Sequence, residues 1–150
     1  MLIRQFEPRD ASAVSNVIRT AMRITNSRDY PPAVLNPLMR YFSPEKVLQL
    51  ALERVCLVAE INEKVIGTIS LENGELETFF VHPDFQARGV GTRLLEAVEE
   101  IAVREKQEII RVLSSLSAVS FYEKMGYRQT GLEEEGTAGR QIRMEKILEA

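Results

Sequence analysis

The chain has 150 residues, 45% of them hydrophobic and 27% charged, and a formal net charge of -3. This length and composition suit one soluble globular domain with a sizeable core, and the weakly acidic balance does not favour a nucleic-acid partner. One cysteine, Cys56, and one histidine, His82, exclude an intramolecular disulfide and a zinc site of the usual Cys/His kind.

The sequence contains no internal repeat, low-complexity tract or flexible linker, so we expect a single domain over residues 1–150. It begins without the apolar stretch of a signal peptide. The longest uninterrupted apolar run, residues 55–59, is far too short to cross a bilayer. No calcium-loop spacing is present. We therefore expect a cytoplasmic protein that binds neither a membrane nor a metal ion.

The first third of the chain predicts one short strand followed by three helices. The strand is expected at residues 2–5. Asp10 is expected to cap the first helix, whose apolar residues recur at helical spacing. Two consecutive prolines, at positions 31 and 32, begin the second helix. Ser43-Pro44 begins the third, because Ser followed by Pro is a typical pair at the N-cap and first turn.

The spacing of apolar residues then changes to that of strands. Three strands are expected, at residues 56–61, 65–71 and 75–81. The first two are separated by Asn62-Glu63-Lys64, which is typical of a hairpin. The last two are separated by Asn73-Gly74, the strongest short-range hairpin signal.

The second half of the chain mixes helices and strands. The expected elements are, in order, a helix at 89–106, a strand at 109–113, a short helix at 117–125 and two closing strands at 127–130 and 141–147. A polar, glycine-rich connection, residues 131–139, is expected between the closing strands. Antiparallel hairpins followed by a strand-helix-strand unit imply a mixed α/β sheet with helices on its faces.

The segment that precedes the long helix has the composition of an anion-binding turn. Gly89 and Gly91 allow the backbone to approach a ligand closely and to adopt positive φ. The N–H groups of the loop and the first helical turn then point outward at the positive end of the helix dipole, and Arg88 and Arg93 add charge. The glycine spacing alone is equally typical of a strand-to-helix turn that binds nothing.

Two other phosphate-binding motifs do not match. Walker A requires G-x-x-x-x-G-K-[ST], and the nearest match, residues 131–136, continues with Thr137 in place of the lysine. The dinucleotide fingerprint requires a third glycine, which the sequence after Gly91 lacks. A P-loop and a Rossmann-type site are therefore excluded.

Two segments carry a resemblance to the GNAT superfamily of N-acetyltransferases. Residues 81–91, VHPDFQARGVG, resemble its V-x-P-x-x-(Q/R)-x-x-G-x-(G/A) signature. Residues 121–127, FYEKMGY, resemble its F-Y-x-x-x-G-F/Y element, at the expected distance downstream. The resemblance extends along nearly the whole chain. It implies a GNAT-like α/β fold with a mixed, mostly antiparallel sheet of about seven strands flanked by helices on both faces.

The resemblance implies acetyl-CoA as co-substrate and indicates which residues bind it. The CoA pyrophosphate would be held by loop amides of Gln86, Ala87, Arg88, Gly89, Val90, Gly91 and Thr92. The pantetheine arm would pair with the backbone of Phe79, Phe80 and Val81, in a slot opened where this strand splays from residues 109–113. Many members carry Asn, contacting the pantetheine, where this chain has Ser115, whose reach is shorter.

The resemblance also implies the reaction, which is direct attack of an amine on the thioester in a ternary complex. Tyr122 matches the usual general acid, which protonates the departing thiolate. Glu75 matches a position at which some members place a catalytic base, whereas others use the level of Glu77 or an ordered water. Both carboxylates are expected to share one strand face with Phe79 and Val81. Alternatively, they only solvate the start of the strand.

The acceptor would be bound by the first third of the chain. Tyr30 could line the entrance, within a segment, NSRDYPP, that resembles a stretch of small uncharacterised bacterial members. An ordinary helix connector is an equally good interpretation. The acceptor would be an amine of a small molecule, a protein N-terminus or a lysine, and a homodimer through the closing strand is compatible with the sequence. His82 is expected to be a surface loop residue rather than the base.

Two other classes of function stay open from the sequence. A catalytically silent acyl-CoA sensor would keep the CoA site without turnover, although the presence of Tyr122 favours the enzyme. A nucleotide-binding protein of another fold would bind ATP or NAD in place of CoA.

Overall fold

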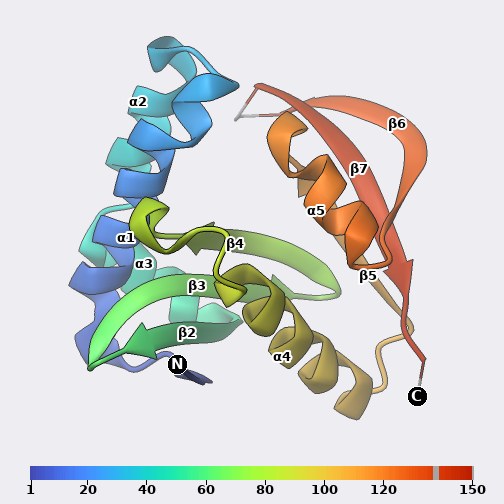
Figure 1. The fold of residues 1–150 in the computed structure, drawn as a ribbon, viewed down its shortest axis with the longest axis horizontal. Coiled ribbons are helices and arrows are strands. Elements are labelled where there is room, and N and C mark those ends of the chain that lie inside the picture. Colours follow the sequence, from blue (N-terminus) through green and yellow to red (C-terminus); the bar gives the residue numbers. More distant parts are fainter. Residues whose placement is uncertain (137–138, 150) are drawn as a thin grey trace.

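The computed structural model describes residues 1–136 and 139–149, and these form one seven-stranded sheet with five α-helices (Figure 1). The strand order is β1-β2-β3-β4-β5-β7-β6. Neighbouring strands are antiparallel except β4 and β5, which are parallel. The predicted mixed, mostly antiparallel sheet is therefore confirmed.

The element bounds follow the predicted order. The strands are β1 (Leu2–Gln5), β2 (Val55–Ile61), β3 (Lys64–Glu72), β4 (Glu75–Val81), β5 (Ile109–Ser114), β6 (Arg128–Gly136) and β7 (Gly139–Ile147). The α-helices are α1 (Ala11–Ile24), α2 (Pro32–Tyr41), α3 (Pro44–Glu53), α4 (Val90–Arg104) and α5 (Val119–Lys124). Short 3-10 turns are η1 (Pro8–Asp10), η2 (Asn26–Arg28), η3 (Pro83–Phe85) and η4 (Leu116–Ala118).

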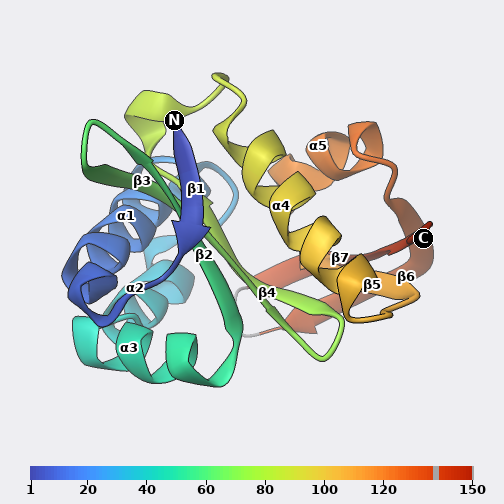
Figure 2. The same ribbon diagram turned by 90° about the horizontal axis from the view of Figure 1, so that it is seen from below.

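Helices cover both faces of the sheet, as predicted (Figure 2). On one face, Leu94 of α4 and Tyr122 of α5 belong to the larger core cluster. On the other, Val17 of α1 and Val47 of α3 pack against Val58 of β2 in a second cluster. Within the described part of the chain, no helix has both the length and the hydrophobicity that a membrane span requires.

The segment that we expected to connect the closing strands is largely strand. β6 continues to Gly136 and β7 begins at Gly139, and residues 137–138 lie outside the described residues. Here the register pairs Glu134 with Gln141. The prediction of a loop is wrong, because backbone pairing with β7 outweighs the low strand propensity of Glu and Gly.

Of the two predicted N-caps, that of α3 is confirmed by a side-chain hydrogen bond and that of α1 is not. The N–H of Lys46 donates to Ser43 Oγ at 3.2 Å, which confirms Ser43 as the cap of α3. Asp10 precedes α1 but makes no side-chain cap bond to it. Its carboxylate instead accepts bonds of 2.8 and 3.0 Å from Arg4, and one of 2.8 Å from the N–H of Glu7. These bonds tie β1 to η1, and the hydrogen bond from Arg4 lowers the pKa of the Asp10 carboxyl.

One glycine sets how closely α4 packs against the sheet. A Cβ atom at Gly67 would lie 3.0 Å from Leu94 Cδ1 and 3.2 Å from Val90 Cγ1. Both of these side chains are buried. α4 can therefore lie this close to β3 only because position 67 has no side chain. Since Gly67 pairs with Val81, the contact fixes the start of α4 beside the end of β4.

Gly67→Ala should lower the free energy of unfolding by about 1–3 kcal/mol, because the added methyl group overpacks the contact with α4. Urea denaturation followed by circular dichroism measures the change. Gly91→Ala is the matched control, because its added Cβ would lie 3.6 Å from the nearest side-chain atoms, an ordinary contact. A Gly67→Ala variant as stable as the parent protein would contradict the close-packing argument.

Candidate active site

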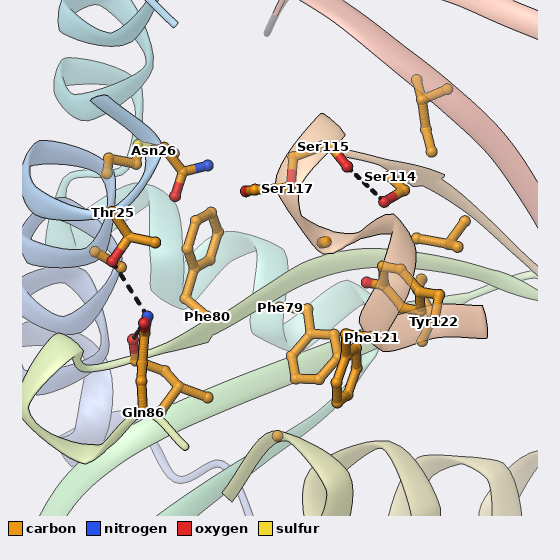
Figure 3. A pocket seen from close by; sticks show the side chains of 18 of the residues that line it. Thr25, Asn26, Phe79, Phe80, Gln86, Ser114, Ser115, Ser117, Phe121 and Tyr122 are labelled. Atoms are coloured by element: carbon orange, nitrogen blue, oxygen red, sulfur yellow. Dashed lines mark hydrogen bonds between the residues drawn. The ribbon is translucent and has the colours of Figure 1, made fainter. Parts of the chain in front are cut away.

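The sheet opens in its middle. β4 and β5 pair only through Glu75 with Arg111 and Leu76 with Val112. Beyond these two pairs the strands diverge, as expected, and a cleft of about 760 Å³ lies between the two halves of the sheet (Figure 3). Residues of α1, α2, β4, the loop before α4, β5, α5 and β7 line it.

The edge of β4 that faces the cleft has backbone groups with no partner strand among the described residues. The N–H of His82 donates to the carbonyl of Ile66 at 2.8 Å. Backbone groups alternate in direction along a strand, so those of every second residue before His82 are directed at β3. The backbone N–H and C=O groups of Phe80 are therefore directed at β3, and those of Phe79 and Val81 point toward the cleft. Among the described residues, β5 pairs with neither of these two positions.

The loop between β4 and α4 has two residues in the left-handed region. The angle φ is 60° at Ala87 and 78° at Gly89. The N–H of Arg93 donates to the carbonyl of Gly89 at 3.1 Å, so the N–H groups of the preceding turn have no acceptor within the helix. Residues 86–89 are exposed. These amides lie at the positive end of the α4 dipole, where an anion is favoured.

Two side chains of the loop have defined contacts. The amide of Gln86 donates to Thr25 Oγ1 at 3.2 Å and to the carbonyl of Val81 at 3.4 Å. Gln86 therefore holds the loop against the end of α1. The guanidinium of Arg88 lies over the ring of Phe85, 5.4 Å from its centroid, and adds positive charge beside the loop amides.

Tyr122 lies in the wall that α5 contributes to the cleft. It is 6% exposed, and its ring makes edge contacts with Phe79, Phe121 and Tyr127 at centroid distances of 6.3, 5.4 and 5.5 Å. Figure 3 shows its hydroxyl directed into the cleft. Burial raises the pKa of the phenol. Tyr122 therefore stays protonated at neutral pH and can donate a proton to a group in the cleft.

A bulge interrupts the alternation of β4. From Ile69 to Leu71 β3 advances two residues, whereas from Phe79 back to Leu76 its partner β4 spans three. Leu76 and Phe79 consequently both pack in the cluster under α4, although they are three residues apart.

Because of the bulge, some side chains of β4 lie on a different face of the sheet than predicted. Glu75 and Glu77 flank a residue that packs under α4, so they lie on the opposite face of the strand. Phe80 lies on that face too, because it packs against the cluster under α1 and α3. The prediction that the two glutamates share a face with Phe79 and Val81 is therefore wrong, because the extra residue shifts the alternation.

The two glutamates differ in their partners. Arg143 Nη1 of β7 donates to Glu75 Oε1 at 2.7 Å. Glu77 lines the same cleft, and desolvation raises the pKa of its carboxyl, against an opposing effect of Arg54. A carboxylate with a raised pKa is the better proton acceptor near neutral pH. The structure thus distinguishes two residues that the sequence leaves unranked.

Ser115 and Tyr30 both line the cleft. Ser115 is the residue before η4, and its carbonyl accepts a bond of 2.7 Å from Ser114 Oγ. Tyr30 is only 5% exposed, and its hydroxyl donates to the carbonyl of Arg140 at 2.7 Å. Tyr30 therefore joins the connector after α1 to β7, and its ring is part of the wall rather than an exposed entrance residue.

His82 lies between β4 and η3 and does not line the cleft. Its side chain is 15% exposed, and its Nδ1 accepts a bond of 3.1 Å from the N–H of Asp84. The ring also makes an edge contact with Phe85, at a centroid distance of 6.0 Å. His82 thus lies in the loop after β4, where capping of η3 holds its partly exposed imidazole against the protein.

Besides the bond of Tyr30, a contact between Asp29 and Ser117 joins the two sides of the cleft, and the sequence does not predict it. Asp29 Oδ2 accepts bonds from the N–H of Ser117 at 3.2 Å and from its hydroxyl at 2.5 Å. The contact joins the connector between α1 and α2 to the turn before α5. In the sequence, only the polar composition of the connector around Asp29 indicates that its side chains make such contacts.

The open edge of β4 leads directly into the loop before α4, whose amides lie where an anion is favoured. An extended ligand with its own amides and a phosphate group at one end matches this arrangement, and the pantetheine and pyrophosphate of CoA have these features. Within the described residues, no group of three or more His, Cys, Asp or Glu side chains is placed to hold a metal ion.

Known proteins are similar to this chain in sequence and in fold. The family model described as "Acetyltransferase (GNAT) domain" matches residues 32–148. The chain is 27% identical over 126 residues to the uncharacterized N-acetyltransferase YafP of Escherichia coli, across 84% of this chain and 80% of that protein. It is 30% identical over 108 residues to the peptidyl-lysine N-acetyltransferase YjaB of Salmonella typhimurium, across 72% and 68% of the two chains. The PaiA N-acetyltransferase of Thermoplasma acidophilum, solved in complex with coenzyme A, aligns with a TM-score of 0.83 at 22% identity, over 97% of this chain and 98% of that one.

Gly91→Asp should lower the affinity for CoA by about 100-fold or more, because a carboxylate beside the loop would face the pyrophosphate with like charge. A side chain at this position would begin inside the cleft, 3.6 Å from the rings of Phe79 and Phe121. Isothermal titration calorimetry measures the affinity. Gly91→Asn, which has the same size and no charge, is the control and should lose much less. Parent-like affinity of Gly91→Asp would refute the loop as the pyrophosphate site.

Proposed function

This chain belongs to the GNAT family of acetyltransferases, and we propose that it transfers the acetyl group of acetyl-CoA to a primary amine by direct attack in a ternary complex. One observation carries the proposal. The open edge of β4 runs into the anion-binding loop of α4, and the hydroxyl of Tyr122 lies in the same cleft. The acetyltransferase name of the relatives, including one that acts on peptidyl lysine, supports an amine acceptor.

In this proposal the chain binds acetyl-CoA with its backbone. The N–H and C=O groups of Phe79 and Val81 pair with the pantetheine arm, as a further strand would. The amides from Gln86 to Thr92 bind the pyrophosphate, assisted by Arg88. Ser115, across the cleft from β4, supplies a hydroxyl near the arm.

The transfer itself needs three proton movements in the site. The acceptor enters as an ammonium ion, and a carboxylate removes one proton so that the nitrogen lone pair can attack the carbonyl carbon. A C–N bond forms, the C–S bond breaks, and Tyr122 gives its proton to the departing sulfur. The second proton of the nitrogen restores the phenol. The products are an N-acetyl amide and CoA, with one proton released to solvent.

We assign the base to Glu77 rather than Glu75. Arg143 already occupies Glu75 with a 2.7 Å hydrogen bond. Desolvation raises the pKa of Glu77, so its carboxylate binds a proton more readily than an ordinary glutamate does. A silent CoA sensor would need neither the carboxylate nor Tyr122 in the cleft.

Tyr122→Phe should lower kcat by about 100-fold while the dissociation constant of CoA changes by less than about threefold. The substitution removes one hydroxyl and keeps the buried ring contacts. Release of free thiol from acetyl-CoA measures kcat, and calorimetry measures CoA binding. Tyr41→Phe is the control, because Tyr41 is 47% exposed and does not line the cleft. A fully active Tyr122→Phe variant would remove Tyr122 from the acid role.

Glu77→Gln should remove the acidic limb of the pH profile of kcat/KM. The carboxylate is the active form, so the rate of the parent protein falls as the pH drops through the Glu77 pKa. Because that pKa is raised, the fall begins at a higher pH than the usual value of about 4.3 for glutamate would give. Glu53→Gln, the same change at an exposed position of α3, should keep the parent profile. An unchanged acidic limb in Glu77→Gln would transfer the role to another group.

A further inference from the structure

We infer that the acceptor is a small primary amine that carries an apolar group, bound between β4 and the helices α1 and α2. This inference rests on the proposed function and narrows its substrate class. Three observations support it, namely an apolar wall, one carboxylate placed for the amine, and contacts that restrict the mouth of the cleft.

Most of the side chains that line the cleft on the α1 side are apolar, and the polar ones, Thr25 and Asn26, lie at the end of α1. Met22 of α1 and Leu35 and Leu38 of α2 line it, together with Phe42 after α2 and Phe80 of β4. The rings of Phe42 and Phe80 meet edge to face, with centroids 6.4 Å apart. A hydroxylated or charged end of an acceptor against this wall would lose hydration without gaining hydrogen bonds, whereas an apolar end would gain contact.

Few charged side chains line the cleft. The charged side chains that line the cleft within the described part of the chain are Glu75, Glu77 and Arg143. Arg143 is bound to Glu75 at 2.7 Å. The remaining carboxylate, Glu77, lies on the same face of β4 as Phe80. An ammonium group at Glu77 therefore places the rest of the acceptor beside the apolar wall.

Two contacts restrict the mouth of the cleft. The hydroxyl of Tyr30 donates to the carbonyl of Arg140 at 2.7 Å, and Asp29 accepts bonds from Ser117. Both join the connector after α1 to the opposite wall, and Figure 1 shows that connector reaching toward β7. Figure 3 shows Asn26 and Ser117 facing each other across the space above Phe80. A bridged mouth favours a small molecule over a lysine on the surface of a folded protein.

The specificity of the parent protein tests the inference. Initial rates with acetyl-CoA are compared for phenethylamine, ethanolamine, putrescine and a lysine-containing peptide. We expect kcat/KM for phenethylamine to exceed that for each of the others by about tenfold or more. A higher value for putrescine, ethanolamine or the peptide would overturn the inference and leave the proposed function standing. Binding of CoA without transfer to any amine would overturn both.

A substitution in the wall provides the second test. Leu38→Asn should lower kcat/KM for phenethylamine by about tenfold, because the wall becomes polar, and should have a smaller effect on ethanolamine. Leu52→Asn is the matched control, because Leu52 of α3 is 73% exposed and does not line the cleft. Unchanged CoA affinity verifies that both variants are folded. Equal losses of kcat/KM with both amines in Leu38→Asn would contradict an apolar acceptor site.

Discussion

The candidate site depends on one interruption of the sheet, the divergence of β4 from β5 after two residue pairs. In an unbroken sheet, the backbone groups of Phe79 and Val81 would be satisfied by the next strand. Here they face a cleft, where the carbonyl of Val81 accepts one bond, from the Gln86 side chain at 3.4 Å. Backbone groups left without partners cost free energy. A ligand with amides of its own can take the place of the missing strand. The feature that weakens the sheet is thus the feature that would hold an extended co-substrate.

The parts of the site that could be predicted are local in the sequence. Residues 81–91 contain the strand end, the glycines and the helix start that together place open amides at the start of α4, so their composition indicates their structure. Even there, the sequence does not indicate the positive φ of Ala87, because alanine does not favour positive φ. Contacts such as Asp29 with Ser117, or Tyr30 with Arg140, join residues far apart in the chain. No spacing rule could have paired them.

The bulge in β4 shows why the faces of a strand could not be predicted from alternation. The N–H of Thr78 donates to Ser70 Oγ at 3.0 Å, so a side chain of the neighbouring strand satisfies the backbone at the extra residue. The bulge is thus supported by β3, and the sequence of β4 alone does not reveal it. One additional residue is sufficient to move Glu75 and Glu77 to the face opposite Phe79. The same dependence on a partner strand explains why residues of β6 that look like a loop are strand.

This separation has a chemical consequence for the proposed reaction. Tyr122 approaches β4 from the face of Phe79, 6.3 Å between ring centroids, whereas Glu77 lies on the face of Phe80. A phenol in direct contact with a carboxylate would direct its proton at that carboxylate rather than at the departing sulfur. With the strand between them, burial keeps the phenol protonated, and desolvation on the other face raises the pKa of the Glu77 carboxyl, as the proposed base requires. An acyl group held along the edge of β4 would then meet the base on one side and the acid on the other, so the bulge that upsets the pattern of the strand also separates the two proton transfers.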